Sequence, residues 1–219
     1  MKKIFLSFLV LVLATGVFAQ SERYQKAMQA NIAAMDTTRT DAGWLDLSSA
    51  FQRIADAEQS QWLPYYYAAY GNVMQGLMLS GGQQGGFADK TDPLADKAEA
   101  LLNKAETLAG GPNADIYCVR KMIANLRMLA DPMTRWQSQG PLGAEALAKA
   151  KALEAGNPRI TILEAQDKFY TPEQFGGSKT EAKALFEEAL KQFETYKPAS
   201  ALHPNWGKNQ VYYFLSQLK

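Results

Sequence analysis

The chain has 219 residues, of which 47% are hydrophobic and 21% are charged, so it can bury a core and lacks the composition of a disordered protein. Its 23 lysines and arginines nearly balance its 22 aspartates and glutamates, which argues against nucleic acid as the main partner because binding to phosphates needs a basic excess. Cys118 is the only cysteine, so no disulfide forms within the chain and stability must come from packing.

The first twenty residues have the pattern of a secretory signal peptide. Two lysines precede an apolar run from Ile4 to Leu13, and Val17 and Ala19 occupy the small-residue positions of a cleavage site. The run is shorter than the roughly 20 residues that span a bilayer, and no second candidate follows it. We therefore expect residues 1–19 to be removed near Ala19. Residues 20–219 are expected to form a single domain, periplasmic or secreted, with no membrane span.

The remaining sequence predicts helices in chain order. Residues 21–58 are expected to form an opening pair, followed by helices over 62–78, 93–109, 115–130, 142–155, 158–170 and 178–195, and by a final helix in the segment from His203. Asp92 before Pro93, and Asn157 before Pro158, are typical helix starts. No segment has the strict alternation of a strand, so the sequence predicts an all-α protein.

The helix expected over 178–195 has the clearest pattern. Its apolar residues form one stripe, consisting of Ala182, Leu185, Phe186, Ala189, Leu190 and Phe193. Ser178 and Glu181 have the spacing of a capping box, which predicts the helix start at this point. Gly176 and Gly177 would then lie just outside the helix, as a hinge and not as a cradle for a ligand.

This helix has a partner earlier in the chain. The segment "TEAKALFEEALKQF" at 180–193 aligns with "DKAEALLNKAETLA" at 96–109, and "AEALAKAKALEAGNP" is a weaker echo. The alignment pairs Ala182 with Ala98, and Leu185 with Leu101. Small residues therefore recur where two helices must approach closely, which indicates an array of similar helices.

The alternation of alanines and large residues in these second helices resembles the tetratricopeptide repeat family. Pro158 at the end of a unit, and Trp62 and Trp206 near the start of first helices, fit the same pattern. The units depart from the family's length of ~34 residues because loops at 79–92 and 171–178 appear as insertions. The resemblance implies an α-solenoid of antiparallel helix pairs, with about eight to nine helices and a final capping helix.

No arrangement in the sequence indicates catalysis or metal binding. His203 is the only histidine, so two-histidine zinc motifs are absent and a catalytic triad would have only this base. The loop "SGGQQGGFADKTD" does not match a phosphate-binding loop, and its aspartates lack the spacing of a calcium loop. Cys118 is expected in the core. We therefore predict no catalytic residues, no metal site and no cofactor.

A cluster of tyrosines stands out in "QWLPYYYAAY", with Tyr65, Tyr66, Tyr67 and Tyr70. Consecutive helical residues point about 100° apart, so we expect at least one of these rings to face a groove or water. In tetratricopeptide stacks the first helices line the concave face. By that resemblance, the expected partner-binding residues are Tyr67, Tyr70, Lys121, Asn125 and Asp167. Lys121 and Asn125 share a helical face and could hold an extended peptide; ordinary solvated residues are the alternative.

Two functions from different classes follow from these patterns. The leading one is an exported, non-catalytic helical-repeat scaffold that binds a protein or peptide partner in the cell envelope through its concave face. The alternative is a small-ligand-binding or accessory subunit of an envelope transport system, with the tyrosine cluster and Trp136 walling an apolar pocket. An enzyme is disfavoured, and would need a carboxyl group with a strongly shifted pKa in a cleft.

Overall fold

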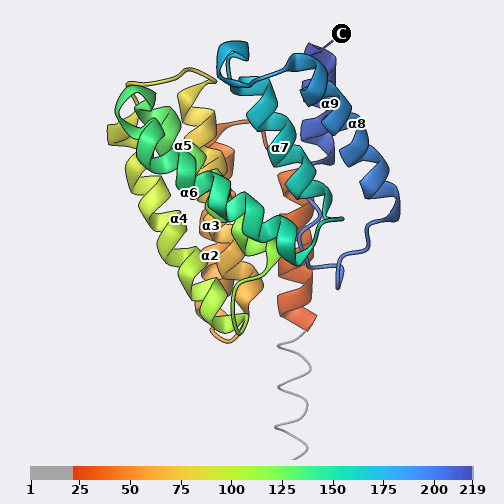
Figure 1. Ribbon diagram of the computed structural model, residues 1–219. Coiled ribbons are helices and arrows are strands. Elements are labelled where there is room, and N and C mark those ends of the chain that lie inside the picture. The colour runs from red at the N-terminus through yellow and green to blue at the C-terminus, as the bar shows by residue number, and fades with distance from the viewer. Residues whose placement is uncertain (1–21, 219) are drawn as a thin grey trace, which may run out of the picture.

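The structure is a computed structural model that describes residues 22–218, and within this range it contains helices and no strand (Figure 1). The all-α class is therefore confirmed. The expected signal peptide at 1–19 and its cleavage near Ala19 lie outside the described residues. None of the helices between residues 22 and 218 combines the length and the apolarity that crossing a membrane would need.

The helices follow one another with short connections. The first covers residues 22–35. It is followed by α2 (Asp41–Ala57), α3 (Trp62–Ser80), α4 (Ala88–Leu108), α5 (Ala114–Ala130), α6 (Pro132–Leu153), α7 (Pro158–Tyr170), the 3-10 turn η1 (Glu173–Phe175), α8 (Lys179–Thr195) and α9 (Lys208–Gln217). Consecutive helices pack on each other, most extensively α2 on α3, α3 on α4, α5 on α6 and α7 on α8. The regular superhelix of the tetratricopeptide family stays a prediction.

The starts of α7 and α8 agree with the sequence patterns. Asn157 caps α7, since its Oδ1 accepts a hydrogen bond from the Arg159 backbone N–H at 3.1 Å. Ser178 caps α8 in the same way, since its Oγ accepts from the Glu181 N–H at 3.1 Å. The hinge glycine Gly176 has a φ of +92°, which other residues rarely adopt. The glycine pair therefore ends η1 and leads into α8.

The starts of α4 and α6 differ from the prediction. Helix α4 begins at Ala88 and not at Pro93, and α6 begins at Pro132 and not near residue 142. Both helices continue through an internal proline, Pro93 or Pro141. A proline inside a helix costs about 3 kcal/mol, and the packing of α4 on α3 and of α6 on α5 outweighs that cost. The loop expected over 79–92 is correspondingly shorter.

Helix α3 is buried on all sides. It packs against α2, α4 and α5, and a segment near the C-terminus covers its remaining face. The exposed fractions of Tyr65, Tyr66, Tyr67 and Tyr70 are 2%, 0%, 1% and 1%. The expectation that at least one ring faces a groove or water is therefore wrong. The four rings do point in different directions, but a packed segment of the protein covers α3 in each of these directions.

The buried apolar side chains form two clusters. The larger cluster surrounds α3 and includes Phe51, Leu102, Ile116 and Trp206. The smaller one lies between α7, α8 and α9. The organisation of residues 20–219 as a single domain stays a prediction.

Candidate functional site

The face of α3 predicted to bind a partner is covered by the chain itself. Residues 196–207, which we name the C-terminal strap, run in an irregular conformation from α8 to α9. The Tyr67 hydroxyl donates to the Leu202 carbonyl at 2.9 Å. The Tyr70 hydroxyl accepts from the Gln210 side chain at 3.1 Å, and its ring stacks on Trp206. Tyr67 and Tyr70 are therefore not available to a partner in this conformation.

A buried ion pair fixes the base of the C-terminal strap. Arg159 is fully buried, and its Nε and Nη2 donate to the Asp115 carboxylate at 2.9 and 2.6 Å. The same Nη2 donates to the Tyr196 hydroxyl at 2.8 Å, and the guanidinium lies against the rings of Tyr196 and Trp206. The pair thus joins the first turns of α5 and α7 to the strap.

The other three predicted partner-binding residues do lie together. Lys121 Nζ on α5 donates to Asn125 Oδ1 at 2.9 Å and to Asp167 Oδ1 on α7 at 2.8 Å. Lys121 is only 5% exposed, and Gly143 on α6 makes room for it, since a Cβ there would lie 3.3 Å from its Nζ. These contacts connect α5, α6 and α7 and occupy two donors of the lysine, so the trio has a structural role here.

The pocket expected between the tyrosine cluster and Trp136 is not formed. Trp136 is 58% exposed on α6, whereas the tyrosines are buried in the core. These side chains therefore do not wall a common cavity.

The structure instead has an open groove along the face of α5 that lies between α4 and α6. We name it the α5 groove, and it encloses about 210 Å³. Its lining consists of Glu99, Tyr117, Arg120, Ile123, Ala124, Arg127, Gln139, Leu142, Glu145, Ala146 and Lys149. On α5, these residues recur every three or four positions and so form one helical stripe. The stripe mixes arginines with apolar residues, and this signal was present in the sequence.

Ion pairs connect the α4 side of the groove to α5. Arg127 donates to Asp96 at 2.7 Å and to Glu99 at 2.6 Å. Arg120 forms an ion pair with Glu106 and donates to Asn103 at 2.9 Å. These α4 residues also recur every three or four positions, so their side chains form a polar stripe facing the arginines.

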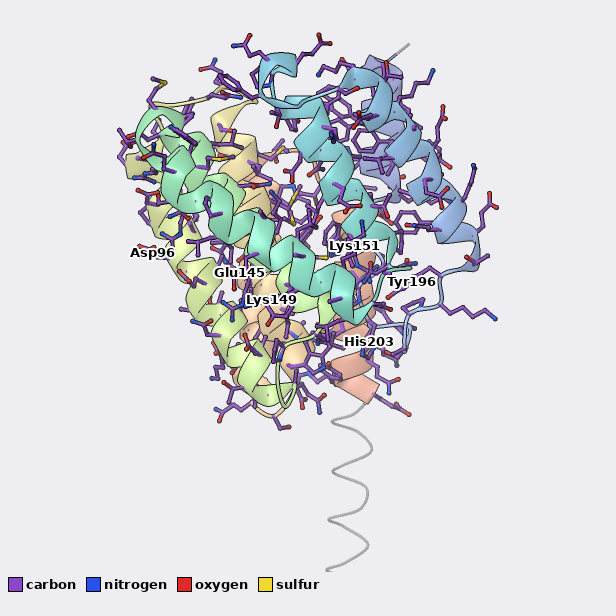
Figure 2. The ribbon with its side chains drawn as sticks, viewed as in Figure 1. Asp96, Glu145, Lys149, Lys151, Tyr196 and His203 are labelled. Atoms are coloured by element: carbon purple, nitrogen blue, oxygen red, sulfur yellow. The ribbon has the colours of Figure 1, made fainter. Side chains whose placement is uncertain are left out.

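The α6 side of the groove contributes a further ion pair. Lys149 Nζ lies 2.6 Å from Glu145 Oε1 and 5.7 Å from the centre of the Tyr117 ring, and Figure 2 shows Glu145 and Lys149 close together on α6. Their hydrogen bond lowers the pKa of Glu145 and raises the pKa of Lys149. Both groups are therefore charged at neutral pH.

The floor of the groove is apolar between these charges. Ile123 and Ala124 are nearly buried, Ala146 lies beside them, and Leu142 is 54% exposed at the rim. The lining includes no histidine, cysteine or methionine. Among the described residues, no cluster of three or more histidine, cysteine or acidic side chains could hold a metal ion. The groove therefore has an apolar floor with cations at its edge, and each of these cations is paired with an acid of α4 or α6.

The comparisons with known proteins find a related solved structure. No protein-family model matches the sequence, and no curated protein matches it either. The structure of the HusA haemophore from Porphyromonas gingivalis superposes on this chain with a TM-score of 0.75 and 34% sequence identity, and the match covers 90% of this chain and 92% of the haemophore. This relative is named for binding and not for catalysis, which agrees with the prediction that the chain is not an enzyme.

Proposed function

The chain belongs to the family of the HusA haemophore, and from this premise we propose that it binds haem in the α5 groove. This is the small-ligand alternative of the sequence analysis. It is favoured over the protein-binding scaffold because Tyr67 and Tyr70, two of the residues that the scaffold would use, are covered by Leu202, Trp206 and Gln210. A protein or peptide partner stays a prediction.

The chemistry of the groove supports this proposal. Haem has an apolar, planar ring with two carboxylates on one edge. Ile123 and Ala124 would contact the ring, between Arg120 and Arg127, which lie two turns apart and hence about 10 Å along the helix. Arginine pairs well with carboxylates because its planar donors match them. The positive side chains over an apolar floor are the observation that carries the proposal.

The size of the groove determines how haem would be held. Sites that enclose a ligand typically measure about 300–1,000 Å³, whereas the α5 groove measures about 210 Å³. Haem would therefore rest in the groove with part of its ring exposed to solvent. Such a binding mode suits a carrier that must hand over its cargo. Tyr117 is the only phenol in the lining, and tyrosine is a known ligand of haem iron.

A charge placed at the rim of the groove tests the proposal. Leu142→Glu puts a negative charge beside the haem carboxylates and should weaken binding by about tenfold or more, equivalent to about 1.4 kcal/mol. Leu153→Glu is the matched control, because Leu153 lies on the same helix, is 57% exposed and is not part of the lining. Binding is measured from the haem absorbance, and circular dichroism checks the fold.

The two variants give clear outcomes. If Leu142→Glu weakens haem binding and Leu153→Glu does not, the groove is the site. If both variants bind like the wild type, haem binds elsewhere. If the wild type does not bind haem, the function itself is wrong.

We also propose that the protein acts outside the cytoplasm, in the periplasm or after secretion. The support is the signal-peptide pattern of residues 1–19. The N-terminal sequence of the protein recovered from its native cells tests this proposal, because cleavage near Ala19 predicts a mature chain that starts at Gln20.

A further inference from the structure

We propose that the acids of the polar stripe of α4 limit the affinity of the α5 groove for ligands with free carboxylates, because they compete with the ligand for Arg120 and Arg127. This inference rests on the proposed function. It concerns how strongly the groove prefers porphyrins with free carboxylates, and it assigns the limit on that preference to residues of α4 that need not touch the ring.

The first observation is that each groove arginine already has a carboxylate partner. Arg127 is bound by Asp96 and Glu99, and Arg120 is bound by Glu106. A ligand carboxylate must therefore replace a protein carboxylate. A ligand without carboxylates leaves these pairs in place and gains nothing from the arginines.

The second observation is that the two sides of the Arg127 pairs differ in exposure. The Arg127 side chain is 20% exposed, whereas its partners Asp96 and Glu99 are 68% and 48% exposed. Asp96 and Glu99 can turn toward water at small cost, so Arg127 stays in the groove when a ligand carboxylate replaces them. Arg120 and Glu106 are equally exposed, at 28% each, so that pair has no such asymmetry.

The third observation is that each arginine keeps a second partner when Glu99 or Glu106 is mutated. Arg127 keeps Asp96 when Glu99 is changed, and Arg120 keeps Asn103 when Glu106 is changed. Ion pairs with exposed partners add little to stability. The acids can thus be neutralised without unfolding the protein or releasing the arginines from the groove.

The test combines a protein variant with a ligand variant. The probes are haem, with two free carboxylates, and haem dimethyl ester, with none. In Glu99→Gln with Glu106→Gln, haem should bind about two- to fivefold more tightly than in the wild type, because a weak competitor is removed. The affinity for the ester should not change. Glu99→Gln alone should give a smaller gain in the same direction.

The control variant is Glu181→Gln on α8. Glu181 is also exposed and forms an ion pair, with Lys168 at 2.6 Å, but it is not part of the groove lining. It therefore reports any effect of net charge alone, and it should leave both affinities unchanged.

The outcomes separate this inference from the function on which it rests. A gain for haem and none for the ester supports the competition. If the wild type binds haem but the α4 variants bind it no more tightly, or if the ester gains equally, the competition is wrong and the haem-binding function stands. If the wild type binds no haem, both the function and this inference fail.

Discussion

The indole of Trp206 lies stacked on the ring of Tyr70, with centroids 4.7 Å apart and an interplanar angle of 29°. The same indole donates its Nε1–H to the Tyr66 hydroxyl at 2.9 Å. One side chain of the C-terminal strap thus contacts two of the clustered tyrosines of α3, and it closes the face that would otherwise be a groove.

Removal of this indole should destabilise the protein strongly. Trp206 is 7% exposed, and Trp206→Ala leaves a cavity and an unpaired Tyr66 hydroxyl, with an expected cost of about 3–5 kcal/mol in the free energy of unfolding. Trp136→Ala is the matched control, because Trp136 is 58% exposed. Its cost should stay within about 0.5 kcal/mol. Urea unfolding measures both, and equal costs would contradict the anchoring role.

The buried ion pair at the base of the strap should be sensitive to loss of one partner. Asp115→Ala leaves the fully buried Arg159 charge without its carboxylate, at an expected cost of about 3–5 kcal/mol. Glu164→Ala removes the partner of Lys151 in an exposed pair, at an expected cost of about 1 kcal/mol or less. Thermal unfolding compares the two, and a small loss for Asp115→Ala would show that water solvates the arginine.

The buried tyrosines should make the protein lose stability at alkaline pH. Burial raises the pKa of Tyr66, Tyr67 and Tyr70 above the usual value of about 10. Near pH 10 these tyrosines ionise only in the unfolded state. The protein therefore keeps its full free energy of unfolding below pH ~10 and loses part of it as the pH rises further.

The variant Tyr67→Phe tests this dependence. At pH 7 it should cost about 1 kcal/mol, because the Leu202 carbonyl loses its donor. Above pH ~10 the difference in the free energy of unfolding between the variant and the wild type should shrink, because the variant has one buried phenol fewer whose ionisation favours the unfolded state. The measurement is the free energy of unfolding from pH 8 to 11, with the exposed Tyr212→Phe as control. A constant cost at every pH would refute the explanation.

Gly207, at the start of α9, should tolerate no side chain. Its φ is +112°, and a Cβ would lie 2.6 Å from Cδ1 of the buried Ile162. Gly207→Ala should therefore cost about 1–3 kcal/mol. Gly156→Ala is the contrast, because Gly156 in the turn before α7 does not have a positive φ, and nothing apart from its chain neighbours lies within 4 Å of the added Cβ. It should leave the stability unchanged or raise it by up to about 1 kcal/mol, and chemical unfolding measures both.

We expect the Tyr117 hydroxyl to contribute to binding of the haem iron and not to binding of the porphyrin ring. Tyr117→Phe keeps the aromatic surface of the groove but removes its only phenol. The variant should bind haem more weakly and metal-free porphyrin unchanged, because only iron takes the hydroxyl as a ligand. Absorbance titrations with both ligands measure the difference. An equal effect on both ligands would remove Tyr117 from iron binding.

Part of the fold could be predicted from local patterns. The starts of α7 and α8 followed from Asn157 and Ser178, since a capping side chain bonds to the backbone two or three residues on. The starts of α4 and α6 could not be predicted in this way. The starts predicted at Pro93 and at residue 142 were wrong, because packing between helices carries α4 through Pro93 and α6 through Pro141.

The candidate site could be predicted only in part. The shared helical face of Lys121 and Asn125 followed from their four-residue spacing, and their hydrogen bond agrees with it. The place of Asp167 near them was expected only from the resemblance to tetratricopeptide stacks, and its contact with Lys121 was not predicted. The burial of Tyr67 and Tyr70 depended on Leu202 and Gln210, which are 135 and 140 residues away along the chain. Contacts at such separations leave no periodic signal in the sequence.

The sequence alone determined the all-helical class and several helix ends, because hydrophobic period and capping are local properties. The sequence also contained the stripe of arginines and apolar residues on α5, but it did not show that this stripe lines a groove. Only the tertiary structure decided which helix faces stay open. The C-terminal strap closes the tyrosine face of α3, while α4 and α6 leave an open groove along α5. The physical reason is that exposure depends on which distant segments pack together, and neighbouring residues do not encode that choice.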